Sequence, residues 1–141
     1  MPERIQLRRG SKAKGWKLPE NAVRVSRPTI FGNPWRIKES GTGRSWIVYD
    51  GRGGEWLYGS KEAAHAGAVT VYGRWLSHNL IPSPYLWTAE ARLELDAQRE
   101  QILAGLPDLR GKDLACWCPL EPVQLACHVD ILLPLANKGH R

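Results

Sequence analysis

The sequence predicts one α/β domain, built as a small, mainly parallel sheet with covering helices. Its 141 residues amount to about one domain, and 43% of them are hydrophobic, which is enough for one core. Apolar residues recur in period two near the start of the chain and at helical spacing in its middle. The resulting order of strand, loop, strand, helix, helix, strand and helix is typical of α/β domains.

The first half of the predicted domain consists of short extended segments. Residues 22–26 (Ala-Val-Arg-Val-Ser) alternate in period two and predict a strand that ends at Arg27-Pro28. The segment 31–35 (Phe-Gly-Asn-Pro-Trp) predicts a loop, because Gly, Asn and Pro all favour turns. The remaining pieces of this half are extended segments and a turn between them: 35–37, 41–43 and 45–49.

Two long helices follow. Ser60 is a suitable N-cap for a helix over 61–78, whose apolar residues share one face. Thr88 is expected to cap a second helix over 89–104, and the following Gly105 and Pro107 to end it.

A strand over 113–118 and an amphipathic helix over 128–136 complete the domain. Pro134 lies within the last helix. A proline there either ends the helix at Leu133 or costs about 3 kcal/mol in its interior.

The net charge of +6 is concentrated at the N-terminus. We expect residues 1–20 to form a basic arm that docks on a domain comprising residues 21–141. Basic side chains can neutralise phosphates and Trp16 can stack on a base, so the arm is either a nucleic-acid-binding element or a solvated tail. The candidate nucleic-acid-binding residues are Arg4, Arg8, Arg9, Lys12, Lys14, Trp16 and Lys17.

The composition also excludes several classes of protein. No run approaches the roughly 18 apolar residues of a membrane-spanning helix, and the first residues lack the apolar stretch of a secretory signal. We therefore expect a cytoplasmic protein without a membrane partner. Three cysteines are an odd number, which argues against a disulfide framework and favours a local site.

All three cysteines fall within twelve residues, at Cys116, Cys118 and Cys127, and His128 follows directly. Cys116 and Cys118 should project together, because residues two apart on a strand face the same side. Cys127 and His128 stand where a helix begins, and a helix N-terminus favours a thiolate.

Three interpretations of this cluster remain open. Cys116, Cys118, Cys127 and His128 have the chemistry of a Cys₃His zinc site, although adjacent ligands on a helix diverge by roughly 100°. Cys127, with Cys118 as its neighbour, is alternatively a nucleophile, with His128 as its base or acid. The third interpretation is a packed cluster, since free cysteines are often simply buried.

A second candidate site surrounds the loop at 31–35. Arg27, with Arg24 and Arg36, presents planar donor groups that suit phosphate or carboxylate, and Gly32 would leave its backbone N–H free for the same anion. With Asn33, these residues are the candidate ligand-binding set; a plain tight turn is the alternative. Ligands of open α/β sheets bind beyond the carboxyl ends of the strands, so both clusters should lie at one edge of the sheet.

The chain resembles domain-of-unknown-function family 4326, whose members are uncharacterised bacterial and phage proteins. The resemblance rests on Val25-Ser26-Arg27-Pro28, Gly32-Asn33-Pro34-Trp35, the run from Gly111 to Pro119, and Cys127-His128-Val129-Asp130. It implies that the basic arm and the cysteine segment belong to one domain, and that the source is a phage or an actinobacterium. It implies no activity.

The leading hypothesis is a nucleotide or nucleic-acid phosphate site formed by the Arg27 loop and the cysteine–histidine cluster. The residues do not decide whether the protein is an enzyme. The alternative is a non-catalytic module, with a structural zinc ion, that binds nucleic acid or a host protein.

Overall fold

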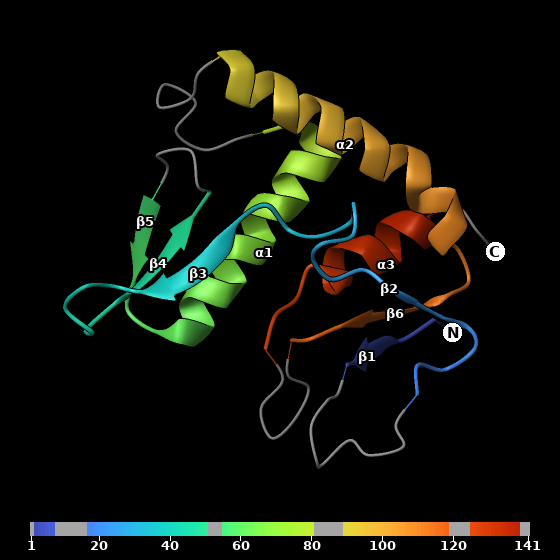
Figure 1. The fold of residues 1–141 in the computed structure, drawn as a ribbon, viewed down its shortest axis with the longest axis horizontal. Coiled ribbons are helices and arrows are strands. Elements are labelled where there is room, and N and C mark those ends of the chain that lie inside the picture. Colours follow the sequence, from blue (N-terminus) through green and yellow to red (C-terminus); the bar gives the residue numbers. More distant parts are fainter. Residues whose placement is uncertain (1, 8–16, 51–54, 81–88, 119–124, 139–141) are drawn as a thin grey trace.

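The computed structural model describes residues 2–7, 17–50, 55–80, 89–118 and 125–138, which form nine elements (Figure 1). In chain order these are β1 (Arg4–Gln6), β2 (Ala22–Arg24), β3 (Arg36–Glu39), β4 (Trp46–Tyr49), β5 (Glu55–Tyr58), α1 (Lys61–His78), α2 (Ala89–Leu109), β6 (Asp113–Cys116) and α3 (Val129–Asn137). The prediction of a mixed α/β domain is confirmed.

One of the two sheets is parallel and has the strand order β1-β6-β2. Val23 of β2 pairs with Leu114 of β6, and Ile5 of β1 pairs with Ala115 on the other side. Strand β1 was not expected, because the prediction placed residues 1–20 in an arm. Its three residues are too few to show a period, and pairing with β6 makes this end of the chain part of the sheet.

The other sheet is antiparallel, in the order β3-β4-β5, which corrects the prediction of one mainly parallel sheet. Ile37 pairs with Val48, and Ile47 pairs with Leu57. The short turn around Gly43 explains the direction, because a parallel pair needs a crossover of a dozen or more residues. Gly43 has a φ of +70°, a conformation that suits glycine.

Helix α1 begins as the sequence predicts. The Ser60 side chain accepts a hydrogen bond from the backbone N–H of Ala63 at 3.1 Å. The buried face of the helix carries Tyr72 and Trp75. The rings of Trp75 and Trp35 pack edge to face, with their centroids 5.3 Å apart. α1 contacts the antiparallel sheet, whereas α3 contacts β6 and β1 of the parallel sheet. A single core therefore joins the two sheets.

α2 continues past the residues expected to stop it, and α3 follows the second of the two outcomes expected for Pro134. α2 passes Gly105 and Pro107 and ends at Leu109, which is buried in the core. α3 passes Pro134 and ends at Asn137, with Leu132 and Ala136 buried on its inner face. Burial of these apolar side chains offsets the hydrogen bond that each proline removes.

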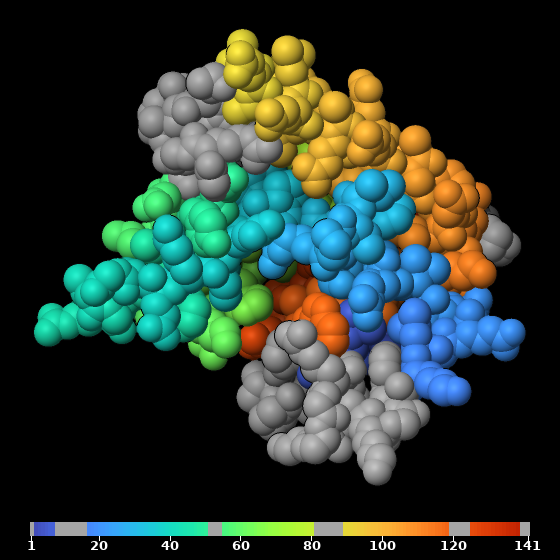
Figure 2. Space-filling view, in the orientation of Figure 1, coloured from blue at the N-terminus to red at the C-terminus, as the bar shows by residue number. Residues whose placement is uncertain are grey.

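The surface of the molecule is hollowed at a point where the C-terminal part of the chain can be seen. In Figure 2, orange and red atoms of this part of the chain show between the green atoms of α1 and the blue atoms that follow β2. None of the described helices is long and apolar enough to cross a lipid bilayer.

Candidate metal and anion site

The parallel pairing of β2 with β6 brings both predicted clusters to one place. Parallel strands end at the same edge, so Arg27, just beyond β2, lies near Cys116, the last residue of β6. The backbone N–H of Val25 extends the pairing by donating to the carbonyl oxygen of Ala115 at 2.9 Å. The start of α3 adds Cys127 and His128 at this edge.

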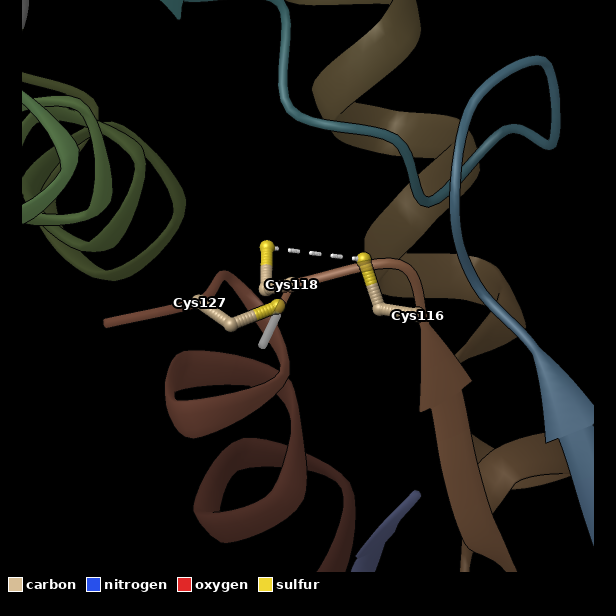
Figure 3. Close-up of side chains that lie close together, drawn as sticks. All are labelled: Cys116, Cys118 and Cys127. Atoms are coloured by element: carbon tan, nitrogen blue, oxygen red, sulfur yellow. Dashed lines mark hydrogen bonds between the residues drawn. The ribbon is translucent and has the colours of Figure 1, made fainter. Parts of the chain in front are cut away.

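The sulfur atoms of Cys116, Cys118 and Cys127 all lie within 4.8 Å of one another, as a metal site requires (Figure 3). The Cys116 and Cys118 sulfurs are 3.8 Å apart. Zn–S bonds of about 2.3 Å at tetrahedral angles place two sulfurs about 3.8 Å apart. Cys116 and Cys127 are buried and Cys118 is half-buried. These three thiols therefore have the spacing of metal ligands.

His128 faces the same cluster. Its Nε2 lies 2.8 Å from the carbonyl oxygen of Val25, which only accepts hydrogen bonds, so Nε2 carries the proton. In the neutral ring, Nδ1 then has a free lone pair. This atom lies 3.5 Å from the Cys127 sulfur and 3.9 Å from the Cys116 sulfur.

Cys127 lies before α3, which begins at Val129, and His128 is the N-cap of this helix. The ligand atoms that lie within 4.8 Å of one another are those of the three cysteines, and His128 is not part of that group. The Asp130 side chain accepts a hydrogen bond from the backbone N–H of Cys127 at 3.1 Å, which fixes the residue before the helix.

The pKa values of the three thiols shift in opposite directions. Hydrogen bonds from Cys118 and then Cys127 lower the pKa of Cys116. Hydrogen bonding to Cys116 raises the pKa of Cys118 to about 11, and it raises the pKa of Cys127 as well. Of the three thiols, the one at the end of β6, Cys116, is therefore the one whose ionisation the cluster favours.

The loop after β2 holds Arg27 in place. Its guanidinium donates to the carbonyl oxygen of Asn33 at 2.8 Å. Desolvation lowers the pKa of Arg27, and the positive charge of Arg36 lowers it further. Two cations are therefore held near one another in spite of their mutual repulsion.

Gly32 and Asn33 use polar groups for hydrogen bonds within the protein that support this loop. The backbone N–H of Gly32 is not free, since it donates to the carbonyl oxygen of Thr29 at 3.1 Å. The Asn33 amide donates to the carbonyl oxygen of Ala68 at 3.1 Å and accepts from the backbone N–H of Trp35 at 2.9 Å. Both residues act by positioning Arg27.

A pocket of about 190 Å³ connects the two clusters. Arg27 and Arg36 contribute to its lining, together with the three cysteines and His128. Ser26 also lines it and is only 3% exposed. The Ser26 hydroxyl has no hydrogen-bond partner among the described residues. Hydroxyl groups this deeply buried normally have a hydrogen-bond partner, so Ser26 offers the pocket a polar group that can still form a hydrogen bond.

His65 and Ser26 belong to this pocket, and neither was a candidate on sequence. His65 is half-buried and lines the pocket beside Val69, one helical turn away. A signal was available: His65 directly follows Ala64 and precedes Ala68, two residues of the buried face of α1. Ser26 carries no such signal, because its role depends on how β2 ends.

Arg4 is not an exposed member of a basic arm. Its side chain is 6% exposed and forms an ion pair with Asp130 at 3.2 Å. It also donates to the carbonyl oxygen of Cys118 at 3.4 Å. Arg4 therefore joins β1 to the segment that carries the cysteines.

The remaining predicted residues lie away from the pocket or outside the described part of the chain. Arg24 is not in the lining; its guanidinium lies 5.9 Å from the centre of the Trp117 ring. Lys17 is exposed. The candidates outside the described residues are Arg8, Arg9, Lys12, Lys14 and Trp16.

The chain was compared with protein-family models, with curated proteins and with solved structures. A family model described as "Domain of unknown function (DUF4326)" matches residues 7–138 and so spans both the arginine loop and the cysteine cluster. No curated protein and no solved structure matches the chain.

Proposed function

We propose that this chain, which belongs to the DUF4326 family, is a zinc-binding domain that binds the phosphate group of a nucleotide beside the metal. Cys116, Cys118 and Cys127 hold the zinc ion, and Arg27 and Arg36 hold the phosphate. The observation that carries the proposal is the single pocket whose lining contains both sets of residues.

The chemistry of the cluster supports zinc. Three thiolates form a soft donor set, which zinc accepts readily at tetrahedral geometry. The anchored Nε2–H of His128 is the arrangement that metal-bound histidines usually show, with the second nitrogen donating to a backbone carbonyl. Buried thiols packed this closely would otherwise repel one another once deprotonated.

The phosphate half of the proposal depends on charge. A zinc ion with three thiolates carries a net charge of about −1, because the ion cancels most of the negative charge of its ligands. Arg27 and Arg36 then make the lining positive. The planar donor groups of arginine suit phosphate oxygens, and the Ser26 hydroxyl adds one further donor.

A second candidate function is a non-catalytic interaction module in which the zinc is purely structural. The orientation of the His128 Nδ1 atom toward two of the three sulfurs supports this candidate, because a fourth protein ligand closes a structural site. It predicts bound zinc without affinity for phosphate.

Titration calorimetry with zinc-loaded protein tests the proposal. Inorganic phosphate and AMP should both bind, and Arg36→Gln should weaken both by about 10-fold or more, as for the loss of hydrogen bonds to a charged group. Arg24→Gln is the matched control, since Arg24 lies outside the pocket lining, and it should change affinity less than about 2-fold. Absence of phosphate binding, or equal losses in the two variants, would contradict the proposal.

A further inference from the structure

A second pocket adjoins the first and extends from the same arginine loop. It has a volume of about 490 Å³, and Arg27, Asn33 and Arg36 line both pockets. The two cations therefore stand between the cysteine cluster on one side and this larger cavity on the other. We propose that the second pocket holds the ribose of the nucleotide whose phosphate Arg27 and Arg36 bind, an inference that rests on the function proposed above.

The sizes of the two pockets support this division. Pockets for small organic ligands usually have volumes of about 300–1,000 Å³. The first pocket, at about 190 Å³, is below this range and suits a group the size of a phosphate. The second lies within it. For a nucleotide whose phosphate lies on the arginines, the second pocket is the adjoining space large enough for the sugar.

The lining of the second pocket offers the groups that sugar hydroxyls need. The Thr29 hydroxyl is buried and has no hydrogen-bond partner among the described residues. Asp50, which is 6% exposed, brings a carboxylate, and carboxylates commonly accept hydrogen bonds from ribose hydroxyls. Gln98 contributes an amide, whose Nε2 lies 3.4 Å from the carbonyl oxygen of Gly32.

Ser26 and Thr29 make the two pockets separately testable. They stand on either side of Arg27-Pro28, and Ser26 lines only the first pocket whereas Thr29 lines only the second. Each carries a hydroxyl that lacks a described partner, so its removal breaks no hydrogen bond within the described residues. Loss of one hydroxyl should therefore report the half of the ligand that lies against it.

The experiment measures the binding of inorganic phosphate, ribose 5-phosphate and AMP to the zinc-loaded protein. We expect ribose 5-phosphate to bind at least about 10-fold more tightly than phosphate, and AMP at least as tightly as ribose 5-phosphate. Thr29→Val should weaken both sugar-bearing ligands by about 3- to 10-fold and leave phosphate unchanged. Ser26→Ala should weaken all three ligands by a similar factor.

Each other result has a separate meaning. Equal affinities of phosphate and ribose 5-phosphate in the unmodified protein would overturn the ribose site while leaving the phosphate site standing. AMP that binds more weakly than ribose 5-phosphate would overturn a nucleotide as the ligand. If ribose 5-phosphate still binds more tightly than phosphate in both Thr29→Val and Gln98→Ala, the ribose lies elsewhere. Failure of all three ligands to bind would overturn the proposed function itself.

Discussion

The ring of His128 connects the end of β2 to the start of α3, because its Nε2 donates to the carbonyl oxygen of Val25 at 2.8 Å. The two residues are 103 positions apart in the sequence. The hydrogen bond fixes the protonated nitrogen and turns the other one toward the cysteine sulfurs. One side chain thereby aligns the cysteine cluster with the loop that carries Arg27.

His128→Ala should lower the affinity for zinc by about 10-fold or more without abolishing binding, because the three thiolates remain. His78→Ala is the control; His78 is exposed at the end of α1 and should leave zinc affinity unchanged. Competition with a colorimetric zinc chelator gives both affinities. Equal affinities of the two variants would remove His128 from the metal site.

Gly32→Ala should weaken phosphate binding and destabilise the fold by about 1–3 kcal/mol. An added Cβ at this position would lie 2.6 Å from Cγ of Arg27, so the arginine would have to move. Gly41→Ala is the matched control, since nothing lies within 4 Å of a Cβ there. Urea denaturation and phosphate titration of the pair check the prediction. Wild-type behaviour of Gly32→Ala would show that Arg27 needs no such support.

Arg4→Ala should destabilise the protein by about 1–3 kcal/mol. It removes a buried side chain and leaves the Asp130 carboxylate and the Cys118 carbonyl without their contacts to Arg4. Lys17→Ala, at an exposed position, should stay within about 0.5 kcal/mol. Denaturant unfolding measures both. If Arg4→Ala instead lost nucleic-acid affinity without losing stability, Arg4 would belong to a nucleic-acid-binding arm.

His65 should make the stability of the protein depend on pH. Burial, and then the charge of Lys61, lower the pKa of His65 below its ordinary 6.5. The unfolded chain therefore takes up this proton at a higher pH than the folded protein, and the stabilisation present above pH 6.5 declines as the pH falls through the folded pKa. His65→Gln should flatten the stability profile between pH 7 and pH 5. If the wild-type protein and His65→Gln had the same dependence of stability on pH, the lowered pKa of His65 would be contradicted.

The parts of the fold that follow local patterns were predictable from the sequence. The alternation at Val23 and Val25, the Ser60 cap and the apolar face of α1 gave correct positions for these elements. β1 and β5 were missed because strands of three and four residues show little periodicity. The sequence placed the end of α2 too early and left the end of α3 open between two positions. In the structure, burial of Leu109 and Ala136 outweighs the local cost of Pro107 and Pro134.

The candidate site was predictable as far as it depends on strand ends. The expectation that Arg27 and Cys118 lie at one edge followed from parallel pairing, and in the structure both line the same pocket. The use of the Asn33 side chain within the protein was not predictable, nor was the place of His65. Both depend on the packing of α1 against the loop, a contact between segments more than 30 residues apart.

Native mass spectrometry of the purified protein with AMP tests the central claim most directly. We predict a species that carries one zinc ion and one AMP, and a variant with Arg27→Gln and Arg36→Gln that retains the zinc but loses the nucleotide. Protein that binds AMP equally well without zinc or without both arginines, or that carries no zinc at all, would contradict the account.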